Sequence, residues 1–235
     1  MIAENLQTIE SRIAAACAKA GRPRDSVQLI AVSKTKPAEM VAEAYAAGQR
    51  LFGENRPQEI TAKRPLLPAD IRWHMIGNLQ RNKVKYVVGQ TALIHSVGSF
   101  SLAEEIERMA AKRELIQEIL VEINVAGEES KQGADLDEAR ALVEAIKDMP
   151  HLRLRGLMTV APYAENPELV RPVFRRLKAL LEAYRPLTRE PACFDQLSMG
   201  MSGDFAVAIE EGATLVRIGS AIFGERDYGK NPEKA

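Results

Sequence analysis

The chain has 235 residues, of which 46% are hydrophobic, and its 32 basic side chains balance its 32 acidic ones. This length suits a single barrel of alternating strands and helices, which takes about 250 residues. A nucleic-acid-binding protein usually shows a basic excess and a membrane protein shows a long apolar segment, so the sequence argues against both classes.

The first apolar pattern predicts an amphipathic helix over residues 1–20, ended near Gly21 and Pro23. After it, strand patterns alternate with helical patterns along the whole chain. The expected strand and helix pairs are 27–32 with 37–48, 51–53 with 55–64, 71–76 with 78–88, 92–95 with 99–113, 116–125 with 136–149, 152–160 with 169–184, 194–197 with 203–211, and 214–218 with 220–224. Such alternation is typical of a parallel sheet covered by helices.

Eight such units in a chain of this length favour a closed barrel over an open sheet. We therefore expect an α/β protein in which residues 1–235 form one (β/α)8 (TIM) barrel domain. Residues 1–20 would be an extra N-terminal helix, and residues 227–235 a frayed polar tail. The N-terminus lacks the basic start and apolar core of a signal peptide, so we expect a cytoplasmic protein.

The residue types that bind metals or form disulfides are scattered. Cys17 and Cys193 lie far apart, and Cys17 falls on the apolar face of the first helical pattern, as a small core residue would. His74, His95 and His151 show no metal-ligand spacing, so no metal site is expected.

Lys34 is the first candidate for chemistry, because it follows the apolar strand 27–32 at the end of a barrel where active sites lie. Desolvation there would lower the pKa of its ammonium group and favour the neutral amine that Schiff-base chemistry needs. A lysine that merely ends a strand remains the plainer interpretation on position alone. Lys36 is a weaker rival, since it lies closer to Pro37 and the helix start.

Two segments rich in small residues follow the seventh and eighth strands, at 198–204 and 217–220. Glycines let backbone N–H groups approach an anion, and barrels often bind phosphate at these two loops. Each segment alone could be a tight turn with a helix cap. Together they predict a phosphate site, which leaves two ligands open: the substrate of a Schiff-base aldolase, or a phosphorylated aldehyde cofactor.

Several segments, in order from residue 29 to residue 224, match a known family. They are LIAVSKTKP (29–37), FGEN (52–55) with QE (58–59), WHMIG (73–77) with LQ (79–80) and NK (82–83), IHSV (94–97), GLMT (156–159), LSMGMS (197–202), VRIGS (216–220) and IFG (222–224). In these segments the chain resembles the pyridoxal phosphate homeostasis proteins, the YggS-like family. Their fold is similar to the barrel domain of alanine racemase standing alone.

The resemblance implies a site for pyridoxal 5′-phosphate (PLP). Lys34 would carry the cofactor as a Schiff base, Asn55 would lie at its ring, and Arg217 would face the pyridine nitrogen. The residues implied to hold the phosphate are Ser198, Gly200, Gly219 and Ser220, with Met199 and Ser202 close by. The implied function is intracellular homeostasis of PLP without substantial turnover, in a protein expected to be a monomer.

An arginine at the pyridine nitrogen bears on the alternative functions. Arginine has only donors and stays charged, so it would keep that nitrogen unprotonated and make the cofactor a poorer electron sink. A PLP-dependent racemase or lyase is therefore the second hypothesis. Racemisation also needs an acid or base on each face of the substrate. In the racemases the second base comes from an additional domain that is not expected here, and Tyr45, Tyr86 and Tyr163 are not expected to replace it.

The resemblance also implies transient transfer of PLP to apo forms of PLP-dependent enzymes, for which Lys36 and Lys131 are candidate second amines. An exposed charged loop is the plainer interpretation of Lys131. The chain departs from the family pattern around the predicted mouth of the barrel, and these departures leave the predicted cofactor contacts in place. The departing residues are Arg56, Pro57, Asn78 and Arg81.

Overall fold

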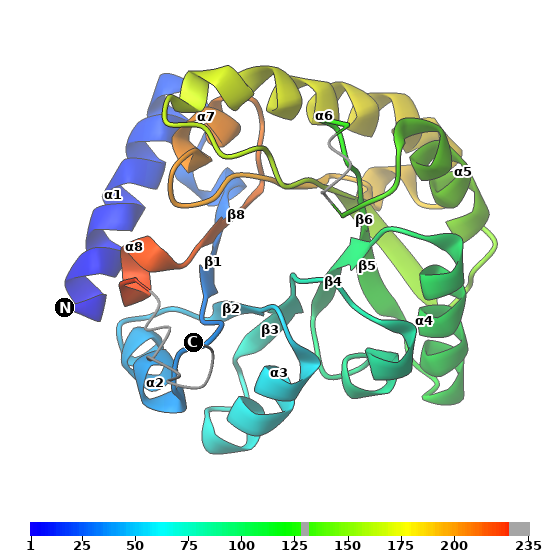
Figure 1. Cartoon of the computed structure of the whole chain (residues 1–235), viewed down its shortest axis with the longest axis horizontal. Coiled ribbons are helices and arrows are strands. Elements are labelled where there is room, and N and C mark those ends of the chain that lie inside the picture. The colour runs from blue at the N-terminus through cyan, green and yellow to red at the C-terminus, as the bar shows by residue number, and fades with distance from the viewer. Residues whose placement is uncertain (128–131, 226–235) are drawn as a thin grey trace, which may run out of the picture.

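The computed structural model describes residues 1–127 and 132–225. Parallel strands close into a barrel in chain order, with β8 pairing back onto β1 and helices ringing the outside (Figure 1). The strands are β1 (Gln28–Val32), β2 (Leu51–Glu54), β3 (Arg72–Met75), β4 (Leu93–Val97), β5 (Gln117–Glu122), β6 (Leu152–Met158), β7 (Gln196–Ser198) and β8 (Leu215–Ile218). The predicted (β/α)8 fold is confirmed.

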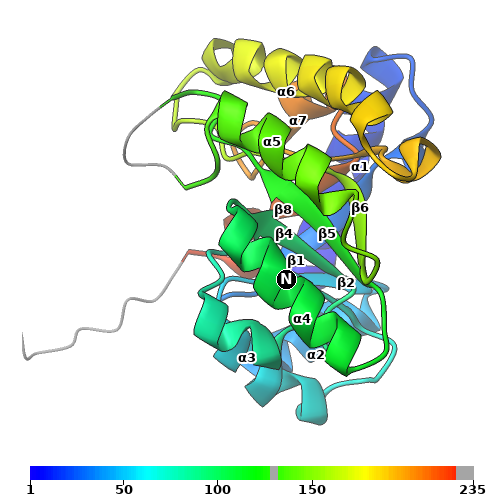
Figure 2. The ribbon, with the colours of Figure 1, turned by 90° about the vertical axis from the view of Figure 1, so that its right-hand side faces the viewer.

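The helices cover the outer face of the barrel, as the side view in Figure 2 shows. They are α1 (Ile2–Lys19), α2 (Ala38–Ala46), α3 (Pro57–Lys63), α4 (Phe100–Lys112), α5 (Leu136–Ile146), α6 (Arg171–Tyr184), α7 (Phe205–Glu210) and α8 (Ser220–Phe223). The residues at the N-terminus of α5 show why this helix begins there: Asp135 and Glu138 form a capping box. No helix in the described ranges is long and apolar enough to cross a membrane.

The extra helix α1 completes the outer layer where α8 is too short to do so. It packs along α7 and α8 (Figure 1), and the side-chain amide of Asn5 donates to the carbonyl of Ile222 at 2.8 Å. Its apolar face, including Cys17 at 1% exposed, is buried in the main core. The extra N-terminal helix and the core position of Cys17 are thus confirmed.

The prediction of a helix over 78–88 is wrong. Residues 76–80 have no regular helix or strand, and a 3₁₀ helix covers Arg81–Tyr86. Gly77 lies so close to the end of β2 that a Cβ atom on it would be 2.6 Å from the Asn55 carbonyl oxygen. The main chain therefore packs against the end of β2 before the 3₁₀ helix begins.

Other boundaries shift by a few residues. The predicted strand 116–125 stops at Glu122, after which Ile123 makes a single bridge to Ala134. The helix expected at 55–64 begins at Pro57, whose ring suits the first helical position. Further 3₁₀ turns lie at Arg24–Ser26, Arg64–Leu66, Pro167–Val170, Arg185–Leu187 and Pro191–Cys193.

A small apolar cluster, separate from the core beneath the helices, fills the inside of the barrel. Its buried members, one from each of five strands, are Ile30, Leu93, Leu120, Met158 and Leu215. Side chains alternate along a strand, so the residues two positions later face the same interior, nearer the C-terminal ends. These later residues include His95, Glu122 and Arg217, so a polar layer lies above the apolar one.

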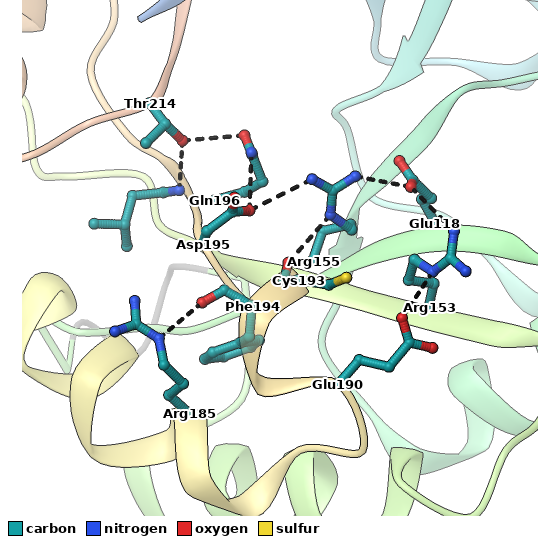
Figure 3. Close-up of polar contacts among 11 residues, drawn as sticks. Glu118, Arg153, Arg155, Arg185, Glu190, Cys193, Phe194, Asp195, Gln196 and Thr214 are labelled. Carbon is teal, nitrogen blue, oxygen red and sulfur yellow. Dashed lines mark hydrogen bonds and ion pairs between the residues drawn. The ribbon is translucent and has the colours of Figure 1, made fainter. Parts of the chain in front are cut away.

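Ion pairs and hydrogen bonds join the opposite, N-terminal ends of β5 to β8 (Figure 3). Arg155 Nη1 lies 2.8 Å from Glu118 Oε1, and its Nε donates to the carbonyl of Cys193 at 3.2 Å. A hydrogen bond with Glu190 raises the pKa of the Cys193 thiol, which disfavours the reactive thiolate. In barrels this end serves stability.

Candidate functional site

All nine predicted site residues lie at or near the C-terminal ends of strands, in two groups. Lys34 and Asn55 follow β1 and β2, and the other residues lie at or after the ends of β7 and β8. The pairing of β1 with β8 brings these two groups together, because Ala31 is in register with Ile218. Lys34 and Ser220 therefore follow neighbouring strands by only a few residues.

Lys34 is half-buried in a turn that leaves β1. The next residue, Thr35, has a φ of 63°, in the left-handed region that a β-branched residue rarely adopts. The Lys36 N–H closes the turn by donating to the Ser33 carbonyl at 3.1 Å, and Lys36 Nζ donates to the Glu225 carbonyl at 2.7 Å. The Lys36 ammonium group is thus bound to the segment that follows α8.

Asn55 is half-buried directly after β2, and its main chain packs against Gly77 at the end of β3. Any side chain at Gly77 would overlap Asn55, because a Cβ atom there would lie 2.7 Å from its Cα. The glycine therefore allows the two strand ends to meet at this point of the barrel mouth.

The loops after β7 and β8 meet through two hydroxyl groups: Ser220 Oγ donates to Ser202 Oγ at 3.3 Å. Gly200 has a φ of 91° and lies against Phe205 and Ala208 of α7, and its carbonyl accepts the Arg217 N–H at 3.0 Å. Within the described chain, no intramolecular bond occupies the N–H groups of Gly200, Ser202, Gly219 and Ser220. This arrangement of hydroxyl and amide donors suits an anion such as phosphate.

Two predicted phosphate residues have their side chains elsewhere. Met199 is fully buried in the main core, and its N–H donates to the Leu215 carbonyl at 3.2 Å. Ser198 is fully buried as well, and its Oγ accepts a hydrogen bond from Arg217 Nη1. The same Oγ lies 2.8 Å from Nδ1 of His95. The hydroxyl of Ser198 therefore belongs to the polar layer inside the barrel.

A chain of hydrogen bonds continues from Ser198 across the interior. His95 Nε2 lies 2.9 Å from Nδ1 of His74, and both imidazoles are buried. Burial lowers the pKa of His74 to about 3 and lowers that of His95 well below its usual value, so both are neutral at pH 7. Since Arg217 can only donate, Ser198 finds an acceptor for its own proton in His95. His95 then donates to His74, whose buried Nε2 has no hydrogen-bond partner among the residues that the structure describes.

Sequence reasoning did not assign a role to these two histidines, because they lie in different strands. The signal that could have found them is the alternation of side chains, which places His95 two positions after the interior residue Leu93. Arg217 is 4% exposed and also donates to the Thr159 carbonyl at 2.9 Å. Burial lowers the pKa of Arg217 to about 10, and because this value is still well above 7, the guanidinium stays protonated at neutral pH.

Glu122 is a third interior group that the sequence did not single out. It is 7% exposed, faces a groove lined by Asn78, Arg81 and Ser99, and makes no hydrogen bond through its carboxyl group in the described ranges. Burial raises its pKa to about 7, and the attraction of Arg217 partly opposes that rise. The groove contains two of the positions that depart from the family pattern, Asn78 and Arg81.

We expect Glu122→Gln to remove a pH dependence from stability. The folded protein holds this proton more tightly than an unfolded chain does, so the stabilisation is present below about pH 4.5 and is lost as the pH rises to about 7. Across this pH range the free energy of unfolding of the wild type should fall by about 1–3 kcal/mol relative to that of the variant. Urea unfolding between about pH 4 and pH 8 measures the difference, with exposed Glu165→Gln as the control. If the free energy of unfolding depends on pH in the same way in Glu122→Gln and in the wild type, the raised pKa of Glu122 is refuted.

The remaining candidates lie apart from the site or outside the described ranges. The hydroxyl of Tyr45 donates to Asp70 at 2.8 Å, and Tyr86 and Tyr163 are exposed on the surface. Arg56 is exposed before α3, whereas Pro57 is buried at its start. Lys131 and the predicted tail 227–235 lie outside the described residues. In the described part of the chain, no three His, Cys, Asp or Glu side chains form a group that could hold a metal ion.

A family model and individual relatives of known name indicate the same protein family. The model of the alanine racemase N-terminal domain matches residues 5–227. The pyridoxal phosphate homeostasis protein of Aquifex aeolicus is 47% identical over 227 residues, which are 96% of this chain and 98% of that protein. The protein of the same name from Escherichia coli is 40% identical over 233 residues, 97% of this chain and 98% of that one.

Solved structures agree. PipY of Synechococcus elongatus with PLP bound superposes with a TM-score of 0.82 at 36% identity, covering 95% of this chain and all of PipY. Alanine racemase from Bartonella henselae shares the fold, with a TM-score of 0.72 at 18% identity, and 98% of this chain covers 60% of that one. The chain therefore belongs to the alanine racemase N-terminal domain family, in the branch of the pyridoxal phosphate homeostasis proteins.

Proposed function

We propose that this protein binds PLP and serves its intracellular homeostasis, holding the cofactor as a Schiff base on Lys34. One observation carries the proposal: the Lys34 turn follows β1, and the hydrogen-bonded Ser220 and Ser202 follow β8 and β7, the next two strands around the barrel. An amine and a phosphate cradle on the same barrel end match the two ends of a phosphorylated aldehyde. The PLP bound to the related PipY supports the same cofactor.

The residues present fit this cofactor. Ser202, Ser220 and the free N–H groups of the two loops would hold the phosphate, and Gly200 and Gly219 keep the main chain close to it. Asn55 would flank the ring. We retain Ser198 and Met199 in the site as supports: Ser198 fixes the Arg217 side chain, and Met199 anchors the loop in the core.

Arg217 supports a binding role over a catalytic one. Bound PLP supplies an electrophilic carbonyl and, in catalysts, an electron sink that usually depends on a carboxylate beside a protonated pyridine nitrogen. Two hydrogen bonds hold Arg217 in the polar layer inside the barrel, one to Ser198 Oγ and one to the Thr159 carbonyl. A positively charged donor at the pyridine nitrogen would disfavour its protonation. Turnover of amino acids would then be slow.

A PLP-dependent racemase or lyase is the second candidate, favoured by the fold that the chain shares with alanine racemase and with D-threonine aldolase. The names of the curated relatives favour homeostasis instead. We place the protein in the cytoplasm as a monomer that releases PLP to apo-enzymes in transient encounters. Lys36 and Lys131 remain the candidate second amines for such transfer.

Titration of the purified protein with PLP tests the proposal. We expect a visible absorption band that borohydride removes, and peptide mapping should then find the reduced adduct on Lys34. Alanine, serine and threonine are added in a parallel assay for racemised or cleaved products. Absence of any band would refute the cofactor, whereas rapid product formation would favour the racemase or lyase.

A further inference from the structure

A cluster of polar groups lies between the sheet and α3, directly behind the Lys34 turn. It comprises the side chains of Ser33, Glu54, Glu59 and Lys63 and the main chain of Thr35, and we name it the turn anchor. Lys63 is only 7% exposed, and Glu54 is fully buried. Lysine is rarely buried unless it is paired. Lys63 lies outside the segments that match the family pattern.

The ammonium group of Lys63 uses three acceptors, one for each of its protons. Nζ donates to the Ser33 carbonyl at 2.8 Å, to Glu54 Oε1 at 2.7 Å and to Glu59 Oε2 at 2.9 Å. Two of these acceptors belong to the ends of β1 and β2, and the third belongs to α3 itself. Lys63 therefore ties two strand ends of the barrel mouth to one helix.

The two carboxyl groups, of Glu54 and Glu59, also bond the residues on either side of Lys34. Glu54 Oε1 accepts the Ser33 hydroxyl at 2.7 Å, and Glu59 Oε2 accepts the Thr35 N–H at 2.7 Å. The residue before Lys34 and the residue after it are thus both held from outside the barrel. Thr35 has a φ of 63°, which a β-branched residue adopts only where its surroundings impose it.

We infer that Lys63 is a positioning residue for the cofactor amine: through the turn anchor it fixes the backbone from which Lys34 projects into the mouth. This inference rests on the proposed attachment of PLP to Lys34. Glu54 also directly precedes Asn55, so the same cluster fixes the start of the segment that would flank the ring. A buried ion pair that served stability alone would not need bonds to the main chain on both sides of Lys34, where the Ser33 carbonyl accepts from Lys63 and the Thr35 N–H donates to Glu59.

Substitution of Lys63 should weaken PLP binding. Since Lys63→Met alone leaves Glu54 buried without its cation, the main variant is the pair Glu54→Gln with Lys63→Met. Loss of the charge-assisted bonds to the turn should raise the Kd for PLP about 10–100-fold and slow adduct formation on Lys34. Lys63→Arg retains the charge and should recover part of the affinity. Lys147→Met, on an exposed lysine after α5, is the matched control and should bind as wild type does.

Hydrogen exchange of the Thr35 amide gives a second readout, measured without PLP. We expect it to accelerate about 10-fold or more in the paired variant and to change little in Lys147→Met. Wild-type PLP binding and wild-type Thr35 exchange in a folded paired variant, or in Lys63→Met should the pair not fold, would overturn the inference while leaving the proposed function intact. A wild-type protein that forms no adduct would overturn both.

Discussion

Replacing Lys34 with alanine is expected to abolish the covalent attachment of PLP completely. The visible band should be absent at any PLP concentration, and borohydride should fix no PLP on the protein. The reason is chemical: a Schiff base needs a primary amine, and we expect Lys34 to supply it, because Lys34 follows β1 as Ser220 follows the neighbouring β8. Non-covalent binding through those loops should persist, at least about 10-fold weaker.

Lys36→Ala is the matched control for this experiment, because Lys36 lies two residues away and its Nζ is bound to the Glu225 carbonyl. We expect this variant to keep the band and the adduct of wild type. Absorption spectra and mass spectrometry after reduction measure both variants side by side. If Lys34→Ala keeps the band, another amine carries PLP, and Lys36 and Lys131 would be mapped first.

Arg217→Met is expected to destabilise the fold by about 3–5 kcal/mol. Arg217 is almost fully buried, and its loss removes the donors to Ser198 Oγ and to the Thr159 carbonyl. It also removes the positive charge that attracts the buried carboxyl of Glu122. Buried acceptors without donors cost more than the lost bonds alone. Urea unfolding at neutral pH measures the effect.

A second substitution separates the two contributions. Adding Glu122→Gln to Arg217→Met removes a buried carboxyl group that must take up a proton on folding, and should restore about 1–2 kcal/mol. Arg56→Met, on an exposed arginine, should change stability by less than about 0.5 kcal/mol. If Arg217→Met lowers the free energy of unfolding by less than about 1 kcal/mol, the prediction is wrong, because the polar layer inside the barrel must then rearrange when Arg217 is removed.

The repeating pattern of apolar residues was enough to predict the barrel, because each strand and helix carries its own period. The errors fall where tertiary contacts decide local structure. The helix expected at 78–88 became a 3₁₀ helix at Arg81–Tyr86, since the main chain first packs against Asn55 at Gly77. Strand β5 ends at Glu122, earlier than its apolar run, where Ile123 pairs with Ala134 instead.

Some residues of the candidate site could be predicted from the sequence, and others could not. Lys34, Asn55 and the loops at 198–202 and 217–220 could be found from the sequence, because they directly follow strands and the barrel rule places strand ends together. His74, His95, Glu122 and Lys63 could not be assigned roles. None of them has a distinctive local motif, and the roles of these residues depend on partners in other elements, such as Glu54 for Lys63 and Ser198 for His95.

The sequence by itself determined the barrel, its extra helix and the family of PLP-binding relatives, because these depend on local periodicity and on contiguous motifs. Only the tertiary structure decided which way the polar side chains point. The Ser198 hydroxyl accepts a hydrogen bond from Arg217 inside the barrel, and the Ser220 hydroxyl donates to that of Ser202. Lys63 donates to the Ser33 carbonyl behind the Lys34 turn. Such choices depend on burial and on hydrogen-bond partners that meet only when the barrel closes.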